Sequence, residues 1–313
     1  MNLQQLRYLN EIARRRLNVS EAAAALFTSQ PGVSKQIKLL EEELGITIFT
    51  RSGKRLTGLT EAGRQVLDIA GRILQDIDNL KHVGEAYASE VRGTLTVATT
   101  HTQARYKLPA VVKRFIERYP HVRLHLHQGN PPQVVTWLTE GEADIGIATE
   151  SLDRAPQLVT MPCYQWSHLI VVLNGHPLLQ QKEILLAQLA EWPLITYDPT
   201  FTGRTKIDQA FERAGLSPNI ALTAVDSDVI KTYVELGLGV GIIAEMAFEA
   251  QRDVTLSARP TGHLFGSNTT RLAIRRGAWL RPIDFAFIEM FAPHLTKEIV
   301  LATLRGEGED CGL

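Results

Sequence analysis

The sequence predicts a mixed α/β protein in which a mainly helical N-terminal module and one long helix precede an α/β body. Two short helical stretches flank a tight break near residue 28, which is typical of a helix-turn-helix. Apolar residues then recur at heptad spacing between residues 66 and 84, and alternating strand and helix patterns follow from Gly93. At 313 residues the chain is long enough for two or three structural units.

The second helical stretch, residues 29–44, has the features of a helix that reads DNA. Ser29 is a good N-cap, and Pro31 suits the first turn. One face is apolar and is predicted to be buried; it carries Val33, Ile37, Leu40 and Leu44. The other face carries side chains that can bind base edges or phosphates, namely Gln30, Ser34, Lys35 and Lys38. Considered alone, this helix is equally compatible with an ordinary amphipathic surface helix.

A basic turn and the distribution of charge favour DNA binding. The turn carries Arg51, Lys54 and Arg55. Residues 1–66 contain ten basic and six acidic residues, a formal charge of +4, whereas the whole chain has a formal charge of −1. This concentration of basic charge is expected if only the N-terminal module contacts DNA. The predicted DNA-binding residues are Ser29, Gln30, Pro31, Ser34, Lys35, Lys38, Arg51, Lys54 and Arg55.

The long helix that follows is predicted to join two copies of the chain. Thr60 and Glu61 suit its start, and its apolar residues recur at spacings of four and three, which makes a heptad seam. A homodimer would bury this seam and present two recognition helices to an inverted repeat in DNA. The alternative is that the helix packs against its own domain. We expect a hinge between Gly84 and Gly93. The predicted dimerisation residues are Val66, Ala70, Ile73, Ile77 and Leu80.

From Gly93 onward the pattern indicates an α/β body with mainly parallel sheets. In such bodies ligands bind where strands end and helices begin. Residues 99–103, Thr149 and residues 202–204 occupy these positions. Their hydroxyl, amide and backbone N–H groups suit an anion that needs no buried countercharge. Considered singly, each threonine is more often a simple cap or strand-end residue.

These motifs resemble those of LysR-type transcriptional regulators. In the N-terminal module the resemblance is carried by residues 28–37, 39–45, 49–51 and 59–63. It implies a winged helix-turn-helix DNA-binding domain at residues 1–59 and a dimerisation helix at residues 60–88.

The same resemblance implies that residues 93–296 form an effector-binding domain with the two-lobed fold of type II periplasmic binding proteins. The implied lobe I covers about residues 93–162 and 268–296, and lobe II covers about residues 163–267. Residues 297–313 are expected to be a poorly ordered tail.

Within the family, residues 99–106, 201–204 and 228–233 resemble the CysB-like branch, whose members control sulfur acquisition. The resemblance implies that the effector is sulfate or a related anion, such as an acylated serine or adenylated sulfate. It implies promoter DNA and further copies of the chain, in a dimer or a tetramer, as partners, with RNA polymerase as a candidate partner. The implied effector-binding residues are Thr100, Thr102, Gln103, Thr149, Trp166 and Thr202.

Two alternatives stay open on the sequence. The regulated genes serve either cysteine biosynthesis or sulfonate use. A protein of another class, a cytoplasmic anion-sequestering protein whose N-terminal module only dimerises, fits the same patterns.

The sequence shows no pattern typical of an enzyme or a metal site. Residues 237–242 resemble a dinucleotide fingerprint, but they follow a helical stretch and precede a strand, which is the reverse of the required order. His125 and His127 alternate on a strand without a third ligand at metal-binding spacing. Asp226 and Asp228 are better explained as helix caps than as a catalytic carboxylate pair. We expect no catalytic residue, no metal and no cofactor other than the effector.

The remaining signals indicate a cytoplasmic protein. The sequence has no stretch of about 18 apolar residues and no signal-peptide pattern at its start. The two cysteines, Cys163 and Cys311, do not suggest a disulfide framework. A redox-sensing role for Cys163 is a weaker hypothesis than burial as a small apolar residue.

Overall fold

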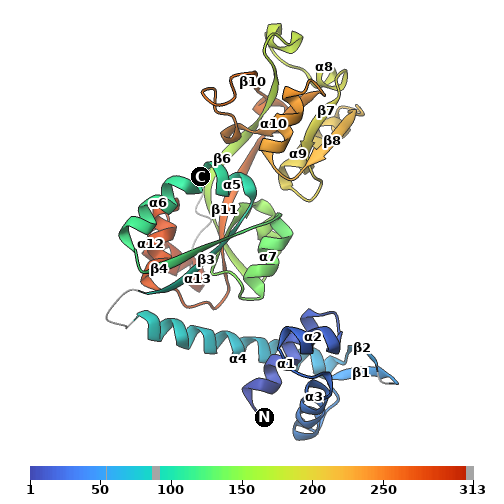
Figure 1. The fold of residues 1–313 in the computed structure, drawn as a ribbon, viewed down its shortest axis with the longest axis vertical. Helices are drawn as coiled ribbons and strands as arrows, with labels where there is room; N and C mark the ends of the chain where they lie inside the picture. Colours follow the sequence, from blue (N-terminus) through green and yellow to red (C-terminus); the bar gives the residue numbers. More distant parts are fainter. Residues whose placement is uncertain (54, 87–91, 308–313) are drawn as a thin grey trace. The chain divides into compact units, whose positions relative to one another are not determined.

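The computed structural model describes residues 1–53, 55–86 and 92–307. They form two compact units, Met1–Gly84 and Glu85–Leu313, each with its own hydrophobic core. The first unit is drawn in blue to cyan in Figure 1, and the second in green to red. The predicted hinge between Gly84 and Gly93 falls mainly on residues 87–91, which lie outside the described residues.

The first unit consists of three short helices, a hairpin and a long helix. Side chains cap the starts of the short helices: the Oδ1 atom of Asn2 accepts from the N–H of Gln5, and the Oγ atom of Ser29 accepts from the N–H of Gly32. The element bounds are α1 Leu3–Arg14, α2 Val19–Ala25, α3 Gln30–Leu44, β1 Phe49–Ser52, β2 Arg55–Leu59 and α4 Glu61–Ala86.

Helix α3 buries one face, as predicted. Val33, Ile37 and Leu40 are at most 2% exposed and belong to the core of the first unit. The prediction that Leu44 shares this face is wrong, because its side chain is 38% exposed. Leu44 lies in the last turn before Gly45, whose φ of +68° ends the helix beyond the edge of the core.

Helix α4 packs partly on its own unit. Ala70 is only 1% exposed within the single chain, and Val66 and Ile73 pack against the same core. The prediction that the whole seam faces a second copy is therefore wrong for Ala70, which instead packs against its own domain. Leu80, farther along the helix, is 71% exposed.

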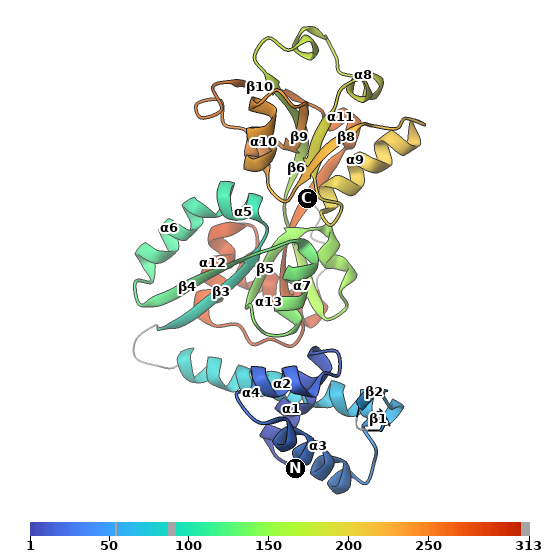
Figure 2. The same ribbon diagram turned by 45° about the vertical axis from the view of Figure 1, so that its right-hand side comes forward.

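The second unit contains one extended mixed sheet with the order β4-β3-β5-β11-β6-β9-β7-β8, and β10 also pairs with β6. The strands are β3 Gly93–Thr99, β4 Val122–Gln128, β5 Ile145–Thr149, β6 Leu158–Leu173, β7 Leu194–Tyr197, β8 Ile220–Ala224, β9 Val240–Ala244, β10 Leu256–Pro260 and β11 Ser267–Arg275. We call the part built on β3, β4 and β5 lobe I and the part built on β7 to β10 lobe II. Strand β6 pairs with strands of lobe II and with β11, and β11 pairs in turn with β5 of lobe I (Figures 1 and 2).

Helices cover the sheet in both lobes. Lobe I carries α5 His101–Tyr106, α6 Leu108–Arg118, α7 Pro131–Thr139, α12 Pro282–Phe291 and α13 Lys297–Arg305. Lobe II carries α8 Leu186–Ala190, α9 Thr202–Arg213, α10 Ser227–Glu235 and α11 Gly262–Phe265. Within the described part of the second unit there are also three short 3-10 helices, namely η1 Glu150–Arg154, η2 Pro177–Gln180 and η3 Glu245–Ala247.

The prediction of mainly parallel sheets is wrong. Strand β3 is parallel to β4 and β5, and β7 is parallel to β8 and β9. However, β11 is antiparallel to β5 and β6, and β6 is antiparallel to β9 and β10. The two long strands cross between the lobes in opposite directions, and the apolar pattern of a single strand carries no information about that direction.

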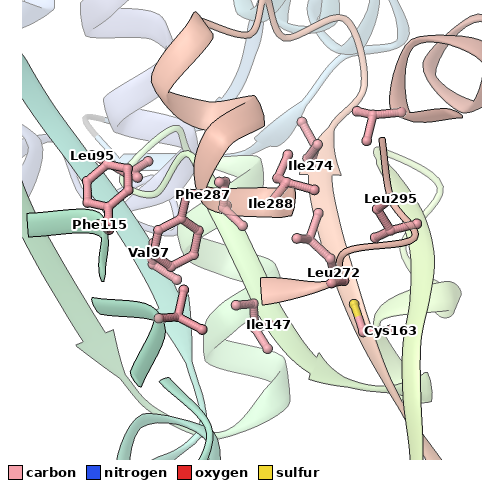
Figure 3. Packing of buried hydrophobic residues seen from close by; sticks show 14 of the residues in the cluster. Leu95, Val97, Phe115, Ile147, Cys163, Leu272, Ile274, Phe287, Ile288 and Leu295 are labelled. Atoms are coloured by element: carbon pink, nitrogen blue, oxygen red, sulfur yellow. The ribbon is translucent and has the colours of Figure 1, made fainter. Parts of the chain in front are cut away.

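The hydrophobic core of lobe I contains Cys163 and one residue of helix α13, and their burial bears on two of the predictions from the sequence (Figure 3). Cys163 lies in this core and is 6% exposed, and burial raises the pKa of its thiol to about 12. It therefore behaves as a small apolar residue and not as a reactive thiolate. Val300 of α13 belongs to the same core and is fully buried. The prediction of a poorly ordered tail is thus wrong for residues 297–305, where a helix begins after Thr296 and packs against lobe I.

The docking of α13 can be tested with Val300→Asp. The substitution buries a charge without a partner, so we expect the second unit to lose about 3 kcal/mol or more of stability. Urea unfolding followed by tryptophan fluorescence reports on this unit, because all four tryptophans lie beyond residue 92. Arg305→Asp, at the exposed end of the same helix, is the matched control. Equal unfolding midpoints for the two variants would contradict the packing of α13.

Candidate DNA-reading surface and effector pocket

The predicted DNA-reading side chains lie on the outer face of α3. Gln30, Lys35 and Lys38 are exposed, as is Pro31, while Ser34 is half-buried next to Gln30. Lys38 reaches Glu42 at 3.5 Å, one turn along the helix. The N-cap Ser29 is also exposed and fixes the start of the helix. The polar face is therefore free of contacts with the core, as a helix in the major groove requires.

The hairpin after α3 is tied to it through one carboxylate. The backbone N–H groups of Ile48 and Phe49 donate to Oε1 of Glu41 at 2.8 and 3.2 Å. Arg51 donates to Oε2 of Glu41 at 2.9 Å and keeps 39% of its side chain exposed. Glu41 thus holds Arg51 beside α3 in a defined orientation. Arg55 is exposed on β2, and Lys54 lies outside the described residues.

Sequence reasoning missed Phe27, which lies in the turn between α2 and α3. Its ring is 98% exposed, and its backbone has a φ of 51°. A left-handed backbone is costly for a residue with a side chain, so this turn carries strain next to the reading helix. The available signal was an aromatic residue at a tight break that contains no glycine.

A pocket between the lobes gathers most of the predicted effector residues. Thr100 and Gln103 come from the start of α5, Thr149 from the end of β5, and Trp166 from β6. The cavity volume is about 30 Å³. The lining consists of Thr100, Thr102, Gln103, Thr149 and Trp166, together with Pro131, Tyr197, Phe201, Gly203 and Ala244. The backbone of Thr202 opens α9 beside this pocket, and its side chain lies outside the described part of the chain.

The pocket lining carries no formal charge. The guanidinium of Arg204 is committed to Asp208 at 2.7 Å and to the carbonyl of Tyr197 at 2.9 Å. Burial raises the pKa of Tyr197, so its hydroxyl stays protonated. An anion here would be held by neutral hydrogen-bond donors, as the sequence predicted.

Two lining side chains differ in what they can offer a ligand. Gln103 donates to the hydroxyl of Thr270 at 3.2 Å and accepts from the hydroxyl of Tyr164, so its side chain is an anchor for the start of α5. The indole Nε1 of Trp166 is buried and, among the described residues, has no hydrogen-bond partner. A buried donor without a partner is costly, and a ligand in the pocket would supply the missing acceptor.

A polar clasp joins the lobes next to the pocket. Asp228 at the start of α10 accepts from the hydroxyl of Tyr106 at 2.5 Å and lies 3.4 Å from both Arg105 and Lys231. Burial opposes ionisation of Asp228, but the hydrogen bond from Tyr106 and the two cations together hold its pKa below the usual range. Lys231 also bonds to Asp253 at 2.9 Å.

A second cavity, of about 320 Å³, adjoins the pocket through Phe201 and is lined in part by His101 and Asp226. Ligand atoms of His101, Asp226 and Asp228 lie within 4.8 Å of one another. Asp226 accepts from the N–H of Val229 at 2.8 Å, as predicted for a helix cap, and Asp228 is engaged in the clasp. These carboxylates already have partners, so the cluster does not point to a metal.

The glycines of residues 237–242 have a packing role. Helix α10 precedes them and β9 follows, which confirms the predicted order. A side chain at Gly239 would meet the carbonyl of Pro193 at 2.3 Å, and one at Gly241 would meet Val171 and Val234 within 2.8 Å.

Comparison with known protein families identifies both units. The model for the bacterial regulatory helix-turn-helix protein of the lysR family matches residues 3–64, and the model for the LysR substrate binding domain matches residues 88–296. The chain belongs to the LysR family of transcriptional regulators.

Within the LysR family, the chain is similar over nearly its whole length to the regulators SsuR, CysB and Cbl. The chain is 53% identical to the regulator SsuR and 52% identical to the regulator CysB, both from Burkholderia cenocepacia, over 97% and 99% of its length and 99% of each relative. It is 48% identical to the regulator Cbl of Escherichia coli over 99% of its length and 98% of the relative.

Two solved structures of LysR-type regulators have a fold similar to that of this chain. The crystal structure of the cofactor-binding domain of the Cbl regulator matches with a TM-score of 0.66 and 47% identity, over 70% of this chain and 96% of that one. Full-length OxyR from Pseudomonas aeruginosa, at 23% identity and a TM-score of 0.65, shares the fold over 94% of this chain and 97% of that one.

The predicted class is therefore confirmed: the chain is a LysR-type transcriptional regulator, similar to CysB, Cbl and SsuR, and not an enzyme. Its N-terminal domain is a DNA-binding helix-turn-helix. Among the described residues, the helices all lack the combination of length and apolar character that crossing a bilayer requires. Helix α13 packs on lobe I although it lies beyond the residues that the substrate-binding family model matches.

The interlobe clasp predicts a dependence of stability on pH. Asp228→Asn removes the charge that Tyr106, Arg105 and Lys231 share, so we expect a lower melting temperature at pH 7. Because the pKa of Asp228 is depressed in the folded protein, its stabilising effect is present above the unfolded pKa and is lost as pH falls through the folded pKa. The gap between wild type and variant should therefore shrink below about pH 4.

Calorimetric melts at pH 7 and in this acid range test that expectation. Asp68→Asn, an exposed acid on α4, should leave the melting temperature unchanged at both pH values. A gap between wild type and Asp228→Asn that stays constant in acid would contradict the role given to this carboxylate.

Proposed function

We propose that the chain switches sulfur-acquisition genes in response to a small sulfur-related anion that binds between the lobes. The candidates are sulfate, an acylated serine and adenylated sulfate. The observation that carries the proposal is the convergence of Thr100, Thr149 and Trp166, from three separate elements, on one small neutral pocket. The buried indole N–H in this pocket has no hydrogen-bond partner among the residues that the structure describes. The backbone of Thr202, and the side chains of Thr102 and Gln103, complete the proposed site.

The proposed switch couples that pocket to DNA binding. A ligand shifts an equilibrium only by its different affinity for the two arrangements, typically by about 1–3 kcal/mol. Effector binding would change how the lobes meet and hence the geometry of a dimer or tetramer. We propose that the C-terminal half of α4, with half-buried Ile77 and exposed Leu80, joins two copies, so that paired recognition helices meet an inverted repeat in promoter DNA. RNA polymerase is the further partner proposed for such a regulator, which would act on DNA in the cytoplasm.

The anion-sequestering alternative has less support, because the similarity to curated regulators extends over nearly the whole chain. A gel-shift on promoter DNA that carries an inverted repeat separates the two functions, since a sequestering protein would form no specific complex.

The effector assignment is tested with Thr100→Val. The variant keeps the shape of a 7%-exposed side chain but loses its hydroxyl, so we expect sulfate affinity to fall by about tenfold or more, and the DNA response to effector to be lost. DNA affinity without effector should be unchanged. Titration calorimetry and gel-shifts measure the two effects, with Thr303→Val on α13 as the matched control. Sulfate binding equal to wild type would refute the assignment.

The DNA-reading surface is tested with Lys35→Ala and Arg51→Ala. Loss of one phosphate contact should weaken operator binding about equally on all sequences and reduce the slope of log affinity against log salt by about one. Fluorescence anisotropy at several salt concentrations measures both quantities. Lys113→Ala, an exposed lysine on α6 of the second unit, should leave the salt slope unchanged. If the salt slope were unaltered in both Lys35→Ala and Arg51→Ala, these two residues would not contact DNA.

A further inference from the structure

Three buried polar side chains form a cluster in the wall of the pocket. Trp166 and His168 lie on β6 and Asn268 on β11; they are 7%, 1% and 0% exposed. Asn268 is the direct cross-strand partner of Trp166 in the antiparallel pair β6–β11. Side chains two residues apart on a strand share a face, so all three project to the same side of the sheet.

This cluster leaves five buried polar atoms without partners. Among the described residues, no hydrogen bond reaches Nε1 of Trp166, Nδ1 or Nε2 of His168, or Oδ1 or Nδ2 of Asn268. Buried polar groups in folded proteins are nearly always satisfied, and each exception requires an explanation. Five such atoms on three neighbouring side chains are too concentrated to be incidental.

The cluster borders the effector pocket at Gly203. Trp166 and Gly203 both line that pocket. A side chain at Gly203 would meet Nε2 of His168 at 2.9 Å and the Trp166 ring at 3.3 Å, so the backbone of this glycine is the layer that covers the imidazole. The Trp166 and His168 rings meet edge to face with centroids 5.2 Å apart, and Phe265 packs against His168 on another side at 5.7 Å.

The hydrogen-bonding capacity of the cluster identifies the chemistry that it would accept. Burial, and then the charge of Lys206, lower the pKa of His168 to about 3, so its ring is neutral at pH 7 and offers one donor and one acceptor. Asn268 likewise offers both. A fully ionised sulfate has acceptors only and would leave Oδ1 of Asn268 and one ring nitrogen of His168 unpaired. A hydroxyl or an amide supplies a donor as well as an acceptor, and the nearby Lys206 disfavours an ammonium group.

We infer that His168 and Asn268 form a neutral hydrogen-bonding subsite for a hydroxyl or amide group on the effector, whose anionic end lies against Thr100 and Trp166. The subsite rests on the proposed function of the pocket. It becomes available when the Gly203 backbone moves away from Nε2 of His168. Under this inference the two residues determine specificity: they distinguish an anion that carries an O–H or N–H group from one that does not.

Titration calorimetry on the full-length protein tests the inference with sulfate and two matched sulfonates. Ethanesulfonate and 2-hydroxyethanesulfonate differ essentially by one hydroxyl. We expect 2-hydroxyethanesulfonate to bind at least about tenfold more tightly than ethanesulfonate, because a ligand without the hydroxyl leaves buried polar groups unpaired. In Asn268→Leu and His168→Phe this preference should fall below about threefold, while sulfate affinity should stay within about threefold of wild type. His176→Phe, a histidine that stacks on Trp192 away from the pocket, should keep the full preference.

The outcomes separate this inference from the proposed function. If wild type binds both sulfonates equally but still binds sulfate, the subsite is wrong and the anion pocket stands. If wild type binds none of the three probes, the anion pocket is wrong and the subsite falls with it. If Asn268→Leu only raises the melting temperature and the hydroxyl preference persists, the cluster has no part in recognition.

Gly203→Ala gives a second measurement should the two core variants fail to fold. Its methyl group would crowd Nε2 of His168, while no hydrogen-bonding side chain is removed from the chain. We expect it to weaken binding of 2-hydroxyethanesulfonate more than binding of sulfate, and an equal effect on both probes would overturn the inference.

Discussion

The antiparallel pairing of β6 with β11 is the constraint on which the rest of the second unit depends. The two strands pair from Ser167 opposite Ser267 to Leu158 opposite Arg275, and β6 then continues into the sheet of lobe II. This pairing, whose register shifts once between Thr270 and Arg271, sets Trp166 beside Asn268 in the wall of the pocket. A slip of one residue would turn these side chains to the other face and remove both the indole donor and the polar cluster behind it.

The lining of the pocket between the lobes carries no formal charge, which is compatible with the anion proposed to bind there. Hydroxyl, indole and backbone donors surround the ligand space, while Arg204 is neutralised by Asp208. The ionic groups that join the lobes lie nearby in the clasp around Asp228. Neutral donors lose less solvation on burial than an isolated cation would, so the empty pocket costs less free energy than one lined by an unpaired cation.

In the DNA-binding unit, Glu41 has a comparable organising role. It accepts from the backbone at the start of the hairpin and holds Arg51 beside α3, so one carboxylate sets the relation between helix and hairpin. The packing of Ala70 on the same core makes the first half of α4 part of this rigid unit.

The sequence alone determined the helix-turn-helix, the caps at Ser29 and Asp226, the order of helix and strand around residues 237–242, and the grouping of Thr100, Thr149 and Trp166. These features depend on local periodicity, on cap chemistry or on family motifs, which are all written along the chain. Only the tertiary structure decided the antiparallel course of β6 and β11, the burial of Ala70 and Val300, and the meeting of His168 with Asn268. Those features depend on which distant segments pair, and the hydrophobic pattern of one segment constrains its own buried face but not the identity or direction of the segment that covers it.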